Sequence, residues 1–262
     1  DGVTGLRLAH AAALARMAGA RVLLLGERHD RAEDHRWQAQ VIAGLAALRG
    51  DLVIGFEMFP RRSQPALDGW VAGRLTEAAF LEASGWREVW GFEPALYRPL
   101  FDLCRDLRLP MRALNVDRPV VSAVGRDGWG AVPEADRGWL SEAAAATPAY
   151  RRYLFEVTGG VRPDRKAGEP DDPAFDRFVR AQQVWDRALA CTLAEVFAKE
   201  PDAVAVGIIG RGHLEFGHGT PAQLAHLGVG PVCVALPDAA GLQAPEDGPP
   251  IADLIFVPPG GD

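Results

Sequence analysis

The chain has 262 residues, 48% of them apolar, and a formal net charge of −7. The length suits one large α/β domain with a sizeable core. The acidic balance argues against nucleic acid as a partner, because phosphate binding needs a basic surface. The widely spaced Cys104, Cys191 and Cys233 form neither a zinc knuckle nor a disulfide framework. No apolar stretch of about 20 residues predicts a membrane span, and no signal or anchor is visible in the sequence.

Short aliphatic runs alternate with stretches of helical apolar spacing along the chain. Helices are expected over 6–18, 33–48, 93–107 and 173–198. Strands are expected over 22–25, 52–56, 111–114, 204–209, 232–235 and 254–257. The 90 residues between the third and fourth strands exceed an ordinary crossover, so helical insertions are expected near 60–93 and 133–180, with a loop over 159–173. The pattern predicts a single α/β domain over 1–262, a doubly wound and mostly parallel sheet flanked by helices, with a small helical lobe.

Polar residues follow four of these predicted strands. Glu27 and His29 follow the first, Glu57 the second, Asn115 and Arg118 the third, and His213 the fourth. Parallel strands bring their carboxyl ends to one edge of the sheet, where ligands bind in such folds. We therefore expect these side chains to cluster there. The candidate catalytic residues are Glu27, His29, Glu57, Arg118 and His213.

Glu57 lies inside an otherwise apolar segment, and burying an ionised acid is costly unless it is paired or ligates something. An ion pair with Arg118 or Arg28 is the alternative to a chemical role. Asp30 with Glu33 has the spacing of a helix-capping box, which would explain those two acids without function.

His29 and His213 are the candidate ligands of a divalent metal. Zinc takes about four N, S or O ligands, which the neighbouring acids would complete. The motifs lack the fixed helical spacing of two histidines that makes a metal site readable from sequence. A metal-free cluster neutralised by arginine is at least as well supported.

Two further patterns carry polar groups. Gln182 and Asp186 fall on the apolar stripe of the 173–198 helix, where a structural role is expected. Tyr150 and Tyr153 are three residues apart with arginines between them. A tyrosinate can ligate ferric haem while arginines pair with its propionates; an amphipathic helix with one half-buried tyrosine is the alternative. Tyr97 is a comparable candidate.

The motifs resemble those of the ChaN family of haem-binding uptake proteins, in a superfamily with Tiki, TraB and the erythromycin esterases. The matching residues are Gly26-Glu27-Arg28-His29, Glu57-Met58-Phe59, Arg61, Gln64, Leu67-Asp68, Trp86, Trp90-Gly91, Tyr97, Pro99, Asn115, Arg118, the 182–186 helix, Gly210-Arg211-Gly212-His213, Gly219 and Pro221. Departures are Asp117, where proline is common in the family, Leu189, where methionine is usual, and the absence of the expected lipid-attachment cysteine near the start.

The resemblance implies noncovalent haem, a role in bacterial iron acquisition at the cell envelope, and a homodimer that sandwiches haem groups. An outer-membrane haem uptake receptor is the partner it suggests. Trp86 and Trp90 would form the walls of the haem site. The axial ligand would be Tyr97, Tyr150 or Tyr153, with an exposed histidine as the alternative. In the wider superfamily, residues matching Glu27, His29, Glu57 and His213 serve hydrolysis.

Three hypotheses follow. Haem binding is favoured. The alternative is a metal-dependent or acid/base hydrolase, in which Glu27 or Glu57 acts as general base and His29 and His213 act as ligands or proton carriers. The third is a polar cluster that only braces the sheet.

Overall fold

Six strands form one parallel sheet in the computed structural model, which describes residues 1–237 and 248–257. The strand order is β3-β2-β4-β1-β5-β6, and every neighbouring pair is parallel. The strands are β1 (Val22–Glu27), β2 (Leu52–Pro60), β3 (Met111–Asn115), β4 (Val204–Gly210), β5 (Val232–Pro237) and β6 (Leu254–Phe256). The predicted doubly wound α/β class is confirmed.

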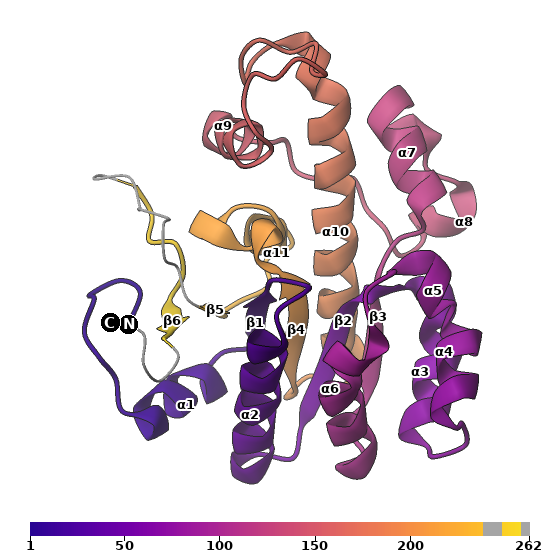
Figure 1. Ribbon diagram of the computed structural model, residues 1–262, viewed down its shortest axis with the longest axis vertical. Helices are drawn as coiled ribbons and strands as arrows, with labels where there is room; N and C mark the ends of the chain where they lie inside the picture. Colours follow the sequence, from indigo (N-terminus) through magenta and orange to yellow (C-terminus); the bar gives the residue numbers. More distant parts are fainter. Residues whose placement is uncertain (238–247, 258–262) are drawn as a thin grey trace.

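Helices cover both faces of the sheet (Figure 1). The longer ones are α1 (His10–Ala18), α2 (Ala32–Leu48), α3 (Gln64–Val71), α4 (Glu77–Ser84), α6 (Pro94–Asp106), α7 (Arg118–Asp127), α9 (Pro148–Val157), α10 (Asp176–Lys199) and α11 (Thr220–His226). The short ones are η1 (Arg61–Ser63), α5 (Trp86–Val89), η2 (Trp129–Ala131), α8 (Glu134–Arg137), η3 (Pro173–Phe175), η4 (Arg211–His213) and η5 (Glu215–Gly217). No described helix has the length and apolar character needed to cross a membrane.

The central strands are continuous apolar runs because both of their faces are covered. Every residue of β1, β2 and β4 is buried. Leu23 and Leu25 point to the α2 and α6 side, whereas Val22 and Leu24 point to the α10 and α11 side. This alternation follows from the two-residue period of a strand.

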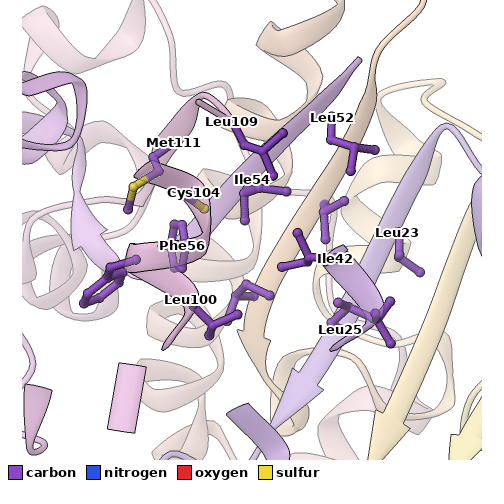
Figure 2. Close-up of a cluster of buried hydrophobic side chains, with 14 of the residues drawn as sticks. Leu23, Leu25, Ile42, Leu52, Ile54, Phe56, Leu100, Cys104, Leu109 and Met111 are labelled. Carbon is purple, nitrogen blue, oxygen red and sulfur yellow. The ribbon is translucent and has the colours of Figure 1, made fainter. Parts of the chain in front are cut away.

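The larger core lies between the sheet and α2 with α6 (Figure 2). Phe56 of β2 packs there among Ile42 of α2 and Leu100 and Cys104 of α6, all essentially buried. Burying one such large apolar side chain stabilises the fold by about 1.5–3 kcal/mol. The core therefore holds β1 and β2 rigidly, and with them the acids at their ends.

Several boundaries differ from the predicted ones. Strand β2 continues past Glu57 to Pro60 because a register shift lets Pro60 pair with Asn115. The predicted 173–198 helix is a short turn, η3, followed by α10. The Asp30–Glu33 capping box is wrong: α2 begins after Arg31 without a side-chain cap. Asp34 instead accepts the backbone N–H of Arg28 at 2.9 Å, which ties the turn after β1 to the helix.

The two predicted insertions contain short helices. The 60–93 segment holds η1, α3, α4 and α5, and the 133–180 segment holds α8, α9, η3 and the first turn of α10. The 159–172 stretch has no regular element, as the Gly- and Pro-rich composition predicts. Helix α9 lies apart from the sheet, beside the upper part of α10 (Figure 1). That the chain is one domain stays a prediction.

Candidate functional site

A cleft of about 430 Å³ opens at the carboxyl ends of β1, β2, β3 and β4. Its polar floor is formed by His29, Glu57, Asn115 and His213. Its apolar wall is formed by Met58, Val89, Trp90, Phe92, Val116 and Trp185, and Arg62, Glu88, Asp117 and Arg118 also line it. Residues up to 184 positions apart in the sequence therefore meet, as the strand-end pattern predicts. The volume is typical of small-molecule sites.

His29 is held from behind by Glu27. The imidazole Nδ1 lies 2.9 Å from Glu27 Oε1, so this nitrogen carries the proton that the carboxylate accepts. The Trp90 and Phe92 rings pack against the imidazole at centroid distances of 4.7 and 5.3 Å. Among the described residues, no hydrogen bond is made by Nε2. The ring therefore turns one nitrogen toward the carboxylate and leaves the other free to meet a ligand.

Glu27 is the centre of a buried network that reaches beyond His29. Its carboxylate accepts the Tyr97 hydroxyl at 2.6 Å and Gln38 Nε2 at 3.3 Å, and it lies 3.4 Å from His35 Nδ1. Burial disfavours the ionised form, but the hydrogen bonds of His29 and His35 outweigh it and hold the pKa of Glu27 at about 2. Glu27 is therefore a permanent negative charge behind His29.

His213 is held in the same way by Asp186 of α10. Its Nδ1 lies 2.7 Å from Asp186 Oδ1, and Asp186 Oδ2 accepts the Tyr150 hydroxyl at 2.5 Å. Burial opposes protonation of His213, but the charges of Glu57 and Asp186 outweigh it and raise its pKa to about 9. His213 is therefore an imidazolium at neutral pH.

The Glu57 carboxylate lies against the end of β4 and His213. One carboxylate oxygen accepts the backbone N–H of Gly210 at 2.5 Å, and the other lies 3.6 Å from His213 Nε2. A Cβ at Gly210 would lie 2.6 Å from His29 Cε1 and 3.3 Å from Glu57 Oε2. Glycine is therefore required here for the imidazole and carboxylate to approach each other above the strand end.

The expected ion pair of Glu57 with Arg118 or Arg28 is wrong. The Arg28 guanidinium binds Asp34 in bidentate fashion at 2.8 and 2.9 Å. The exposed Arg118 donates to the Val89 carbonyl at 3.3 Å. Glu57 is satisfied instead by a backbone amide and an imidazole, because the turn after β4 folds over the end of β2. Arg118 lines the cleft, but within the described part of the chain it makes no hydrogen bond or ion pair with His29, His213 or Glu57.

The structure places the three tyrosines and Trp86, for which haem contacts are predicted, outside the lining of the cleft. Tyr97 is fully buried, and Tyr150 and Tyr153 are 5% and 8% exposed. Each hydroxyl donates to a carboxylate, and burial together with that charge raises the pKa of each phenol. Trp86 is also buried, and its Nε1 donates to the Phe92 carbonyl. Of the two predicted wall tryptophans, Trp90 is the one that lines the cleft.

Within residues 1–237 and 248–257, no group of three or more His, Cys, Asp or Glu side chains is placed to hold a metal ion. His29 and His213 each direct Nδ1 to a carboxylate behind the ring. The proposed pair thus lacks the further ligands that a zinc site needs.

Sequence reasoning missed two residues of this site. His35 and Gln38 are buried on α2, one turn apart, and their helical spacing from each other was the available signal. Asp186 was expected to be structural, and its partner His213 lies 27 residues away. No local pattern reveals that contact, because it depends on how α10 packs on the sheet.

Comparisons place the chain among known proteins. No curated protein matches its sequence. A structure described as cofacial haem binding to ChaN of Campylobacter jejuni is 17% identical, with a TM-score of 0.71, covering 93% of this chain and 91% of that one. An erythromycin esterase mutant, EreC, in its open conformation is 14% identical, with a TM-score of 0.51, covering 92% and 77%.

The C-terminal region of Pasteurella multocida toxin, described as having a thiol-protease-like catalytic triad, is 11% identical. Its TM-score is 0.50, and the match covers 90% of this chain but 25% of that one. At such identities these likenesses show a shared fold. A sequence model of the family described as haem-binding uptake, Tiki superfamily, ChaN matches residues 13–224. Because that match spans most of the sequence, the chain belongs to the ChaN haem-binding uptake family of the Tiki superfamily.

Proposed function

We propose that this chain binds one noncovalent haem in the strand-end cleft. The observation that carries this proposal is the free Nε2 of His29 on the floor of the cleft, beside an aromatic wall. Family membership supports haem as the ligand. A neutral imidazole nitrogen is a common axial ligand of haem iron.

The residues present fit such a group. The wall of Val89, Trp90, Phe92, Val116 and Trp185 suits the apolar face of a macrocycle, and Arg62 and Arg118 lie where carboxylates of a bound molecule would meet positive charge. Arg62 is already paired with Asp117, which leaves Arg118 as the better candidate for that contact. When bound, haem would supply an iron with one position for the imidazole.

His29 replaces the tyrosines as the proposed axial ligand. The three tyrosines of the chain are buried and donate to Glu27, Asp186 and Glu215. Ligation by any of them would take one donor away from a buried carboxylate, and water cannot readily replace that donor in a dry site, which is costly. His29, in contrast, keeps its bond to Glu27 when Nε2 binds a metal, and such a carboxylate behind the ring is the usual support of a ligating histidine.

A haemin titration tests this proposal. The wild-type protein should shift the Soret band to a saturable end point near one haem per chain, and acidified organic solvent should extract the haem. His29→Ala should abolish the ligated spectrum, whereas the exposed His10→Ala should leave it unchanged. An unshifted band in the wild type contradicts haem binding. A wild-type spectrum in His29→Ala contradicts the choice of ligand.

The wider role stays a proposal as well. We propose iron acquisition at the cell envelope, a homodimer that brings two haems together, and an outer-membrane haem uptake receptor as the partner. Light scattering with and without haemin tests the dimer directly: a mass of two chains is expected on haem addition. A single-chain mass at saturating haemin contradicts it.

A second candidate function, hydrolysis, is favoured by a separate observation. Glu57 lies against the imidazolium of His213, while His29 stands opposite with a free nitrogen. In this arrangement His29 Nε2 would take a proton from water, whose oxygen attacks a carbonyl, and His213 would protonate the leaving group. A series of chromogenic esters tests this: Glu57→Gln should fold normally yet lose the activity, because His213 loses the negative charge that helps to keep it protonated as the proton donor. A lack of turnover by the wild type across the series contradicts hydrolysis of esters.

A further inference from the structure

Helix α9 presents two tyrosines to the back of the site. Tyr150 and Tyr153 are three residues apart, so both lie on one face of the helix, and their rings are nearly parallel with centroids 6.3 Å apart. The Tyr150 hydroxyl donates to Asp186 Oδ2 at 2.5 Å. The Tyr153 hydroxyl donates to Glu215 Oε2 at 2.7 Å.

One of these carboxylates binds His213, and the other belongs to the same turn after β4 as His213. Asp186 accepts the imidazole Nδ1–H at 2.7 Å. Glu215 is two residues further along the turn after β4, where the Arg211 guanidinium also binds it. Helix α9 is therefore hydrogen-bonded both to Asp186, which binds His213, and to Glu215 in the turn that contains His213.

The same contact is closed to solvent. Asp186 is fully buried and Glu215 is 3% exposed. The His218 ring covers both phenols at centroid distances of 5.4 and 5.7 Å. Water cannot readily replace a lost hydroxyl in such a place, so loss of either phenol would leave one hydrogen bond of its buried carboxylate unmade.

We propose that Tyr150 and Tyr153 are positioning residues that hold His213 with Nε2 toward Glu57, so that the inserted helical lobe is part of the site. For its catalytic consequence, this inference rests on the second candidate function, hydrolysis. The positioning of His213 itself rests only on the hydrogen bonds Tyr150–Asp186, Tyr153–Glu215 and His213–Asp186.

The experiment follows the imidazole N–H protons by NMR in protein labelled with ¹⁵N-histidine. In the wild type, the Nδ1–H protons of His29 and His213 should both be protected by their carboxylates. The double variant Tyr150→Phe, Tyr153→Phe should exchange the His213 proton at least about tenfold faster, since one buried bond is worth on the order of a factor of ten. The His29 proton should keep its wild-type rate.

Tyr97→Phe is the matched control, because it removes the same kind of phenol–carboxylate bond behind the other histidine. It should speed exchange at His29 and spare His213. Wild-type exchange at His213 in a folded double variant, judged by circular dichroism, overturns the proposal. Equal acceleration at both histidines also overturns it, because that result indicates general loosening.

If the double variant does not fold, Tyr153→Phe alone carries the test, since Glu215 keeps its bond to Arg211. Where an ester is hydrolysed, the variant should lower kcat and leave KM near its wild-type value. The absence of any hydrolysis by the wild type refutes the second candidate function and leaves the NMR result to decide the positioning role by itself.

Discussion

The two histidines of the cleft are held by the same arrangement, assembled from different parts of the fold. In each case a tyrosine hydroxyl donates to a buried carboxylate, which accepts the imidazole Nδ1–H. On the His29 side, carboxylate and histidine are two residues apart at the end of β1. On the His213 side, the carboxylate comes from α10 and the phenol from α9.

The two sides also differ in how many groups depend on the carboxylate. Within the described residues, the Glu27 carboxylate contacts His29, His35, Gln38 and Tyr97, whereas the Asp186 carboxylate contacts His213 and Tyr150. The His29 side is thus joined to the core beneath α2 and α6. Substitution of Glu27 should therefore lower the free energy of unfolding. Substitution of Asp186 should mainly increase the mobility of the His213 side chain.

The largest expected effect is the loss of stability in Glu27→Gln. Removing the charge from a buried network leaves its other members unpaired, and we expect a loss of about 3–5 kcal/mol in the free energy of unfolding. Asp186→Asn should cost about 1–3 kcal/mol because fewer partners are affected. Urea unfolding measures both. The exposed Glu33→Gln on α2 is the control, with a change within about 0.5 kcal/mol. Equal losses in the free energy of unfolding for Glu27→Gln and Asp186→Asn would contradict the expected difference between the His29 and His213 sides.

The pH dependence of stability should separate the two sides. The pKa of Glu27 is lowered from 4.5 to about 2, so its stabilisation is present above pH 4.5 and is lost as the pH falls through 2. The pKa of His213 is raised from 6.5 to about 9, so its stabilisation is present below pH 6.5 and is lost as the pH rises through 9. Each contributes at most about 3 kcal/mol.

Thermal unfolding across pH 2–10 measures the loss of stability at each end of the range. Glu27→Gln should reduce the loss at low pH only, and His213→Gln should reduce the loss at high pH only. If one substitution removes both the acid and the alkaline loss of stability, Glu27 and His213 titrate as one unit and the comparison fails.

Glycine substitutions offer a smaller test of each side. Gly210→Ala would push a Cβ against His29 and should cost about 1–3 kcal/mol and weaken haem binding. In Gly219→Ala, the new Cβ would lie 2.5 Å from the His213 carbonyl oxygen. The backbone φ of +57° at this position is also strained for alanine, so strain adds to the clash. Gly212→Ala, in the same turn with its nearest contact at 3.9 Å, is the control. Thermal unfolding and haemin titration of the three variants measure the losses of stability and of haem affinity. A loss in the Gly212 variant as large as in the other two would contradict the prediction.

The smallest expected effect is at Arg118, an exposed residue of the cleft lining. Arg118→Gln should weaken haem binding by about two- to fivefold, because an exposed ion pair contributes about 0.2–1 kcal/mol. Arg126→Gln, further along the same helix and outside the cleft lining, should leave the affinity unchanged. Haemin titrations at low and high salt measure this effect, which should shrink at high salt. A loss as large as that of His29→Ala would mean that Arg118 acts on the ligand histidine itself.

Much of the first side could be predicted from the sequence. The aliphatic run 22–25 followed by Glu27 and His29 placed an acid and a histidine at a strand end, and the structure has them there in direct contact. Glu57 and His213 were placed at the same edge by the same reasoning, and they lie 3.6 Å apart. These predictions succeed because a strand's two-residue period and the common direction of parallel strands are properties of local sequence.

Partner choice could not be predicted in this way. The tyrosines carry the right chemistry for a metal ligand, yet each points into the interior and binds a carboxylate. The expected arginine partners of Glu57 bind elsewhere. Which donor reaches a buried acid depends on helix packing, over distances that no motif spans.

The strand-end cluster, the α/β class and the family can all be predicted from the sequence, since each depends on patterns of residues close to one another in the chain. The donors behind the two histidines are known from the folded chain alone: Tyr97 binds Glu27, and Tyr150 of α9 binds Asp186. The physical reason is desolvation: a buried carboxylate takes whichever donor the packed core brings to it, and that neighbour is chosen by the fold as a whole.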